Sequence, residues 1–314
     1  MEPIVHAPTT IIPHSLIAEP GGFISDTRSP WFIAWKEIRG NKINFACFLY
    51  LVFAVVVSLL APWIAPHDPD AVDLLQGRLL PPFFVEGGSL EFPLGTDSTG
   101  RDVFSRLLYG GRISLFLGFI PVCLGFALGV PFGLVSGYLG KKWDEIFMRI
   151  NDCLLAFPSI LLALIIVAFL GQGIGNLMIA VGFSYAPTFA RVIRSAVLAE
   201  KNKEYVTGAF SLGATHPQII WKHLLPNVTN SLIVVFTLSF ASALLEAAGL
   251  SFLGLGVKPP AAEWGSMLAD GKNYFYDGWW MILFPGIAIF TVVMTLNILG
   301  DALRDALDPR NVKK

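Results

Sequence analysis

Charged residues are scarce in this sequence. Asp, Glu, Lys and Arg make up 14% of the 314 residues, and hydrophobic residues make up 54%. An ordinary soluble domain carries about 25% charged residues. The formal net charge is −1 and no basic patch is present, which argues against a nucleic-acid partner. The composition therefore indicates a chain embedded in lipid, although its length would suffice for two soluble domains.

Residue patterns that mark enzymes and metal sites are also lacking. The three cysteines lie in or beside apolar runs without a CxxC pair, so neither a disulfide framework nor a zinc site is indicated. The five histidines are scattered without an HExxH pattern, and Ser159, His216 and His223 form no catalytic set. No GxxxxGK[ST] segment is present, so any ATP chemistry has to lie in another chain. We expect no catalytic residue, no metal and no cofactor in this chain.

Long charge-free runs are what the sequence has in abundance. A helix needs roughly 20 apolar residues to cross a bilayer. The run from 153 to 190 is too long for one crossing, and glycines and amides at 171–176 favour a turn within it. We therefore predict an all-α polytopic membrane protein with six transmembrane helices, at 43–65 and at about 113–140, 153–170, 177–198, 227–249 and 278–300.

The distribution of Lys and Arg predicts the orientation. Segments on the side of the two termini hold 16 of the 22 basic residues, and the opposite segments hold six. By the positive-inside rule both termini are cytoplasmic. Residues 1–42 are polar and contain no cleavage signal, so we expect the first apolar segment to remain as an anchor.

This orientation divides the chain into parts. We predict a cytoplasmic N-terminal segment (1–42), a peripheral anchor helix (43–65), a first extracytoplasmic segment (66–111), a core (112–300) and a cytoplasmic tail (301–314). The core has an inside loop at 199–226 and an outer loop at 257–277. Glycines and prolines concentrate in the core spans, which suits helices that pack closely and bend.

The inside loop has the pattern of a helical hairpin. A helix through roughly 200–212 would end at Gly213, which suits a left-handed C-terminal stop. Thr215 is a fitting N-cap for a second helix, with Pro217 in its first turn and Gln218 completing a capping box. Pro226 is expected to end that helix. The apolar surface predicted for it consists of Ile219, Ile220, Trp221, Leu224 and Leu225. Such a hairpin either docks a cytoplasmic partner or packs beneath its own bundle.

The loop resembles the EAA loop of bacterial ABC-importer permeases. That pattern is Glu-Ala-Ala, three residues, Gly, nine residues and Ile-x-Leu-Pro. Here it falls on Thr207-Gly208-Ala209, on Gly213 and on His223-Leu224-Leu225-Pro226, with the spacing kept. Thr207 stands where the family has Glu and His223 where it has Ile. Glu204, one helical turn before Thr207, is a candidate substitute for that carboxylate.

Further segments resemble the peptide and nickel permease group, in its C-type subunit. They are 94–106, 111–115, 154–159, 249–260, 263–265 and 299–310, and the resemblance runs from about residue 36 to the end. It implies a type I ABC-importer permease bundle in the cell inner membrane. The implied partners are a homologous second permease, one or two ATPases that bind ATP and Mg, and an extracytoplasmic binding protein.

The same resemblance implies which residues couple the bundle to the ATPases. The second hairpin helix would be the coupling helix, pushed as the ATPases close. The residues assigned to this role are Glu204, Thr207, Gly208, Ala209, Gly213, Thr215, His216, Pro217, Gln218, Leu225 and Pro226.

Glu246 is the acid within a predicted span. Such a group is costly in lipid and usually faces a bundle interior. It either contacts cargo in the translocation path or bonds to its neighbours. Trp279 and Trp280, beside the last span, are expected in the aromatic belt at the membrane boundary.

Alternatives remain open at this stage. Dipeptides or oligopeptides are the expected cargo, and nickel chelates and glutathione are carried by closely similar permeases. A secondary transporter is a weaker reading, because such proteins usually show ionisable groups at mid-membrane and an internal repeat.

Overall fold

The computed structural model describes residues 30–72 and 77–307, and in these two stretches the chain forms helices and no strand. The elements in chain order are α1 (Pro30–Gly40), α2 (Lys42–Leu59), α3 (Ala61–Ile64), α4 (Val103–Leu139), α5 (Lys141–Leu155), α6 (Ser159–Leu170), α7 (Ile174–Glu200), α8 (Glu204–Ser211), α9 (His216–Gln218), the π-helical turn η2 (Ile219–Leu224), α10 (Leu225–Phe252), α11 (Trp264–Gly271), the 3-10 turn η3 (Lys272–Tyr274) and α12 (Trp280–Leu307). The predictions for 1–29 and 308–314 lie outside the described residues.

Within residues 30–72 and 77–307, four helical runs are long and apolar enough to cross a membrane by themselves. They are α2, α4, the run from His216 to Phe252, and α12. Helices α5 and α6 together make a fifth candidate, bent by 88°. Helix α7, with 27 residues, has the length to cross, but its last turns carry Arg191 and Arg194.

The third predicted span has a different shape from the expected one. Instead of one straight helix at 153–170, the chain forms α5 across the predicted loop and then the 12-residue α6, about 18 Å long. The break falls at Phe157-Pro158, because the residue before a proline avoids the helical region. The charges of α5 concealed it, since six of its 15 residues, including Lys141, Asp144 and Arg149, are charged.

Helix α4 begins at Val103, ten residues before the predicted start of span 2. Asp102 is its N-cap, and the Asp102 carboxylate accepts from the N–H groups of Phe104 (3.2 Å) and Ser105 (3.0 Å). The charged residues Arg106 and Arg112 therefore belong to the helix. The sequence pattern placed them in a loop because their charges break the apolar run.

Helices α4 and α7 form the main packing contact of the bundle. Gly125, Gly129 and Gly133 of α4 lie directly against the α7 backbone, and a Cβ at Gly129 would come within 2.2 Å of the Ala186 carbonyl oxygen. Close approach of this kind is how helices associate in lipid. The core around this contact also includes Phe189 and Ile193.

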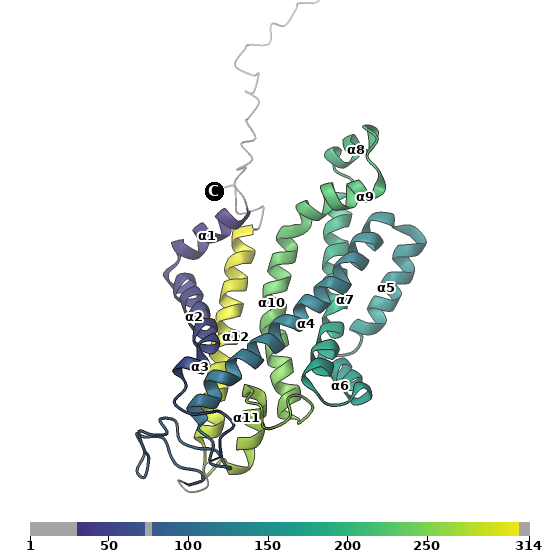
Figure 1. The fold of residues 1–314 in the computed structure, drawn as a ribbon. Helices are drawn as coiled ribbons and strands as arrows, with labels where there is room; N and C mark the ends of the chain where they lie inside the picture. Colours follow the sequence, from purple (N-terminus) through teal and green to yellow (C-terminus); the bar gives the residue numbers. More distant parts are fainter. Residues whose placement is uncertain (1–29, 73–76, 308–314) are drawn as a thin grey trace, which may run out of the picture.

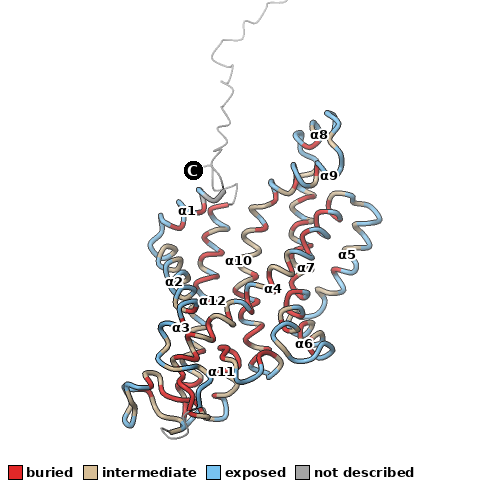
Figure 2. The backbone as a smooth tube through the Cα atoms, viewed as in Figure 1, coloured by how far each residue is buried: buried red, intermediate tan, exposed pale blue. Residues whose placement is uncertain are grey.

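Figure 1 shows how the remaining helices surround this pair. Helix α4 crosses the molecule diagonally, with α5, α6 and α7 on one side and α1, α2 and α12 on the other. The hairpin of α8 and α9 projects from one end, and α11 with the segment before α4 forms the opposite end, here called the outer lobe (residues 66–72, 77–102 and 253–279). Buried residues are frequent in α4, α7, α11 and α12, whereas α2 is largely exposed (Figure 2).

Candidate functional site

The hairpin between α7 and α10 forms as two short helices around a glycine turn. Helix α8 begins at Glu204 and not near 200, because α7 continues to Glu200 and a turn follows at 201–203. Gly213 has φ +89° and no atom within 4 Å of the position of an added Cβ, so the backbone conformation is what favours glycine here. The predicted glycine stop is confirmed.

The second hairpin helix has the predicted cap at its start. Gln218 Oε1 accepts from the Thr215 N–H at 2.8 Å, and the two residues form a capping box with Pro217 in the first turn. The predicted end at Pro226 is wrong. The turn η2 continues directly into α10, and the Leu225 N–H bonds to the Ile220 carbonyl five residues back. A π turn before a proline removes the clash with the carbonyl four residues earlier, so the helix continues.

One side of the hairpin belongs to the bundle core. Val206, Ile219 and Leu224 are buried, and they join the cluster that includes Val197 of α7 and Val228 of α10. Ile219 is only 1% exposed. Of the two alternatives for the predicted apolar surface, packing beneath the bundle therefore holds for Ile219 and Leu224.

The opposite side presents three other apolar side chains. Leu212 is 91% exposed, and Phe210 and Trp221 are each 58% exposed. We call these three residues the docking face. Most residues assigned to coupling are exposed around them, namely Glu204, Thr207, Gly208, Gly213, Thr215, His216, Pro217, Gln218 and Pro226, while Ala209 and Leu225 are partly buried. Exposed apolar groups at a helical tip are typical of an interaction site.

Side-chain contacts anchor the hairpin to the ends of α4 and α7. The hydroxyl of Tyr138 lies 2.6 Å from His216 Nδ1, and Lys201 Nζ donates to the Gly137 carbonyl at 2.8 Å. Tyr205 donates to Glu200 Oε2 at 2.8 Å, and burial together with that carboxylate raises the pKa of Tyr205 to about 12. The tyrosine therefore remains a donor at any physiological pH.

An ion pair and a hydroxyl contact join α4, α5 and α7. Asp144 of α5 accepts from Arg194 Nε at 2.5 Å and from Arg194 Nη2 at 2.6 Å. Ser136 of α4 donates to the same carboxylate at 2.5 Å. A bidentate pair of this kind fixes orientation as well as distance, so α4, α5 and α7 are held in register beneath the hairpin.

Glu246 of α10 faces the bent helix pair α5–α6. Ser159, the first residue of α6, donates to Glu246 Oε1 at 2.5 Å, and the ring of Tyr185 from α7 lies beside the carboxylate. The carboxylate thus lies at the N-terminus of α6, where a helix has unpaired N–H groups. Glu246 bonds to its neighbours, and no contact here tests a role toward cargo.

A polar cleft opens near the hairpin end of the bundle. Its volume is about 520 Å³, and it lies between α7, α10 and α12. Asn227, Asn230 and Ser231 of α10 form its polar wall, with Glu200 and Arg304 also in the lining. Polar groups facing a cavity at this depth are expected where water or solute enters a bundle.

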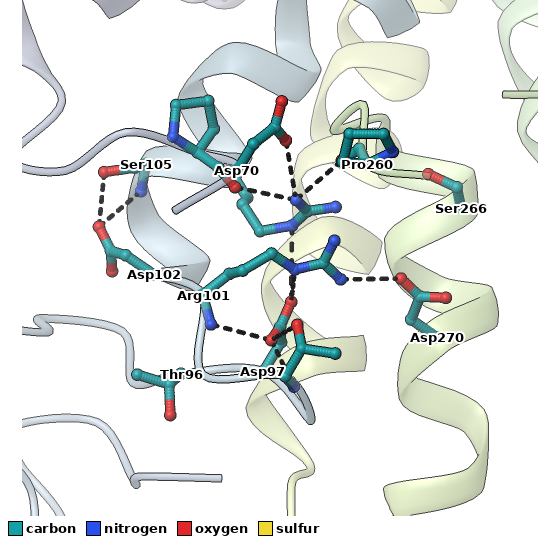
Figure 3. A network of polar contacts seen from close by, with 12 residues as sticks. Asp70, Thr96, Asp97, Arg101, Asp102, Ser105, Pro260, Ser266 and Asp270 are labelled. Atoms are coloured by element: carbon teal, nitrogen blue, oxygen red, sulfur yellow. Dashed lines mark hydrogen bonds and ion pairs between the residues drawn. The ribbon is translucent and has the colours of Figure 1, made fainter. Parts of the chain in front are cut away.

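A network of buried charges holds the outer lobe. Arg101 Nε donates to Asp97 Oδ2 at 2.6 Å, and Arg101 lies between Asp97 and Asp270 of α11 (Figure 3). Arg106 donates to the carbonyls of Pro69 at 2.9 Å and Pro260 at 3.1 Å. Burial raises the pKa of Asp270, and the neighbouring arginines oppose that rise. The network ties three distant parts of the chain together.

Two further buried polar contacts lie in the outer lobe and directly beside it. The Glu263 carboxylate is the N-cap of α11, accepting from the N–H groups of Gly265 (2.7 Å) and Ser266 (2.8 Å). Trp280 is buried, and its Nε1–H donates to the Thr96 carbonyl at 2.9 Å. The prediction that Trp280 belongs to the aromatic belt is wrong. The sequence signal that could have identified the lobe is the density of Asp and Arg at 97–106 in a polar turn.

The several apolar helices packed into one bundle define an α-helical integral membrane protein. Residues 129–313 match the family described as binding-protein-dependent transport system inner membrane component. Residues 29–82 match the N-terminal transmembrane domain of oligopeptide transport permease C. The chain belongs to this family, and it is the permease subunit of an ABC importer.

Individual proteins agree with the family match. The chain is 43% identical over 282 residues to the di/tripeptide transport system permease protein DppC of Pseudomonas aeruginosa, covering 90% of this chain and 93% of that protein. It is 41% identical over 286 residues to the glutathione transport system permease protein GsiD of Escherichia coli, covering 90% and 91%. A solved structure of the MetNI methionine ABC transporter aligns with TM-score 0.54 at 22% identity, over 64% of this chain and 96% of that one. This last similarity shows the fold alone.

Proposed function

We propose that this chain forms half of the translocation path of an importer for di- or oligopeptides. Relatives that are 40–43% identical carry names that refer to dipeptides, tripeptides and glutathione. A glutathione or nickel-chelate importer of the same group is the second candidate for cargo. The observation that carries the coupling mechanism is the unbroken helical run from His216 to Phe252, which joins the exposed hairpin to the bundle interior.

We further propose that the chain crosses the cell inner membrane six times and that both termini lie in the cytoplasm. The bent α5–α6 pair serves as the third span and α7 as the fourth. The excess of Lys and Arg on the side of the termini supports this orientation. In this arrangement the hairpin and the polar cleft are cytoplasmic, α2 is the peripheral anchor, and the outer lobe is extracytoplasmic.

In this mechanism the hairpin receives force from an ATPase. Phe210, Leu212 and Trp221 insert into a partner surface, and the buried face of the hairpin moves with α4 and α7 as one body. The hairpin has to be rigid to transmit the movement of the ATPase, because a bundle with two conformations responds to a partner only through elements that do not deform locally. The capping box, the bond between Tyr138 and His216 and the continuity of η2 with α10 support that rigidity.

The remaining partners follow from the same mechanism. A homologous second permease completes the pore, one or two ATPases hold ATP and Mg, and an extracytoplasmic binding protein delivers cargo to the outer lobe. The polar cleft of α7, α10 and α12 is the exit from the path. Glu246 stays a candidate for the path wall, and the bond from Ser159 supports a role in holding α6 against α10.

The docking face provides the sharpest test. Leu212→Asp and Trp221→Asp should each lower ATP-dependent uptake of a labelled dipeptide at least tenfold, while the chain still inserts. The reason is that a charge replaces an apolar side chain that the bound ATPase would cover. Asn202→Asp adds the same charge to an exposed turn outside the docking face and should leave uptake unchanged. Normal uptake and normal co-purification of an ATPase with Leu212→Asp would refute the docking assignment.

Partner composition is tested by gentle extraction of the tagged chain from native membranes, followed by mass spectrometry of its companions. A second permease and one or two ATPases at defined stoichiometry are expected. Competition of the labelled dipeptide by glutathione or by a nickel chelate would then separate the two cargo candidates. Recovery of the chain without any ATPase would contradict the proposal.

A further inference from the structure

The polar cleft near the hairpin is graded along the helix that forms its floor. Helix α10 lies between α7 and α12 (Figure 1) and contacts both of them. In chain order, its polar lining residues Asn227, Asn230 and Ser231 come first, and Val234, Val235 and Leu238 follow. This spacing of three and four residues marks one face of a helix, on which Leu238 lies about 12 Å deeper than Asn230. The cleft therefore has a polar end beside the hairpin and an apolar end towards the bundle interior.

The walls from α7 and α12 follow the same order. Val192 and Ala196 of α7 line the cleft before Glu200, the last residue of that helix. Arg304, in the last turn of α12, lines the polar end. The volume of about 520 Å³ lies within the range of about 300–1,000 Å³ that is usual for small-molecule sites. The cleft therefore suits a molecule with a polar group at one end and an apolar group at the other.

The polar end contains three side chains that lack partners. Within the described part of the chain, Asn230, Ser231 and Arg304 form no side-chain hydrogen bond and no ion pair. Ser231 and Arg304 are exposed, Asn230 is half-buried, and polar atoms are exposed in the lining of the cleft. A guanidinium has only donors, and an amide and a hydroxyl can each add a donor. A group with several acceptor atoms and a negative charge satisfies all three.

The acid of the cleft already has partners of its own. Glu200 accepts from Lys203 Nζ through Oε1, and it accepts from the Tyr205 hydroxyl through Oε2 at 2.8 Å. Both carboxylate oxygens are thus occupied by residues at the base of the hairpin. Among the residues that line the cleft, Arg304 therefore holds the charge that is left without a counter-charge.

We propose that the polar end of this cleft binds the C-terminal carboxylate of the transported peptide and that the apolar end holds its last side chain. The inference rests on the proposed function, which makes peptides the cargo and the hairpin end cytoplasmic. Arg304 provides a charge-assisted fork for the carboxylate, Asn230 and Ser231 provide further donors, and Val234 and Val235 contact the side chain. The bound peptide is the one about to be released, so peptide already in the cytoplasm competes for the same site.

The test measures binding of labelled Ala-Phe to the full transport complex in nanodiscs, without ATP and without the binding protein. The wild type should bind Ala-Phe about tenfold more tightly than Ala-Phe amide, which lacks the carboxylate, because a charge-assisted contact is lost. Arg304→Gln should bind both peptides equally and weakly. Arg149→Gln changes an arginine that is 78% exposed and outside the cleft, and it should discriminate between the peptides as the wild type does.

Several outcomes would overturn the proposal. Equal affinity of the wild type for the two peptides would do so, as would unchanged discrimination in Arg304→Gln. Val235→Trp fills the apolar end and should abolish binding of both peptides, and if it does not assemble, Ala196→Leu narrows the same cleft from α7. Inorganic phosphate and phosphatidylglycerol offer an anion of similar chemistry and should leave Ala-Phe bound. Displacement by either one would assign the site to another anion and refute a peptide site.

Failure of this inference can be distinguished from failure of the proposed function. ATP-dependent uptake of Ala-Phe with the binding protein present tests the proposed cargo. Normal uptake by a wild type that binds no Ala-Phe in the cleft would refute the inference alone, whereas absence of uptake would refute the cargo. Excess Ala-Phe on the ATPase side of proteoliposomes should slow uptake by the wild type several-fold and leave the rate of Arg304→Gln unchanged.

Discussion

The arginines of this chain differ in how much of their charge the protein itself neutralises. Arg106 is almost fully buried, and it contacts the carboxylate of Asp97 through Nε and the carboxylate of Asp70 and two carbonyls through Nη1. Arg149 is largely in solvent and pairs with Glu145 one turn away. Removing one member of a buried pair leaves the other charge without compensation, whereas exposed pairs contribute little.

Arg106→Met should therefore destabilise the outer lobe by about 3 kcal/mol, because Asp97 loses a buried partner and two carbonyls lose a donor. Arg106→Lys should fall between the wild type and the methionine variant, since a lysine keeps the charge and loses the fork. Thermal unfolding in detergent and protease sensitivity of residues 77–102 measure the effect. Arg149→Met is the matched control and should unfold like the wild type. An unchanged melting temperature in Arg106→Met would show that the network is not required.

Among the elements, the hairpin depends on backbone conformation more than on side-chain packing. Gly208 and Gly213 lie in the same hairpin, and a Cβ at either position would meet nothing within 4 Å. They differ in that Gly213 has φ +89°, whereas Gly208 lies within α8 at ordinary helical angles. A left-handed conformation costs a residue with a Cβ about 1–2 kcal/mol.

Gly213→Val should therefore reorient the second hairpin helix and lower dipeptide uptake per ATP hydrolysed several-fold, while the chain still inserts. Gly208→Ala should leave transport unchanged, and it should raise the stability of α8 slightly, because alanine favours a helix over glycine by about 1 kcal/mol. Parallel measurement of uptake and ATPase activity in proteoliposomes separates coupling from assembly. Equal coupling ratios in both variants would refute a requirement for the left-handed turn.

The whole bundle depends on the approach of α4 to α7. Three glycines spaced four residues apart in α4 place its backbone against that of α7, and the aromatic rings of Phe126, Phe189 and Phe236 pack beside them. Because lipid gives no hydrophobic driving force for helix association, this packing carries much of the fold.

Gly129→Val should lower the yield of folded, monodisperse chain more than any hairpin variant. An added Cβ would lie 2.2 Å from the Ala186 oxygen and 2.7 Å from Phe189 Cβ, so backbone has to move, at a cost of about 1–3 kcal/mol or more. Gly175→Ala, where nothing lies within 4 Å, is the control and should be tolerated. Size-exclusion profiles in detergent after matched expression provide the measurement, and a normal profile for Gly129→Val would contradict the packing argument.

Sequence patterns predicted the turn and the cap of the hairpin, and they predicted the spans only in part. Gly213 and the Thr215–Gln218 box could be predicted because a left-handed turn and a cap are local, and each depends on a few adjacent residues. The 88° bend at Phe157-Pro158, the early start of α4 and the passage of the helix through Pro226 could not. In α4 and at Pro226, a charge or a proline that normally ends a span is accommodated by distant groups or by a π turn, whereas Pro158 breaks its span.

By itself, the sequence determined the membrane location, the family, the local geometry of the hairpin and the absence of a nucleotide motif, because these follow from composition and short-range patterns. Only the tertiary structure decided that Ile219 faces the core while Leu212 faces outward, and that Trp280 is buried against Thr96. It also decided that Arg106 pairs with a carboxylate 36 positions away and donates to a carbonyl 154 positions away in sequence, whereas Arg112 has no partner among the described residues. Burial and charge compensation depend on which distant segments meet, and that is set by packing of the whole bundle.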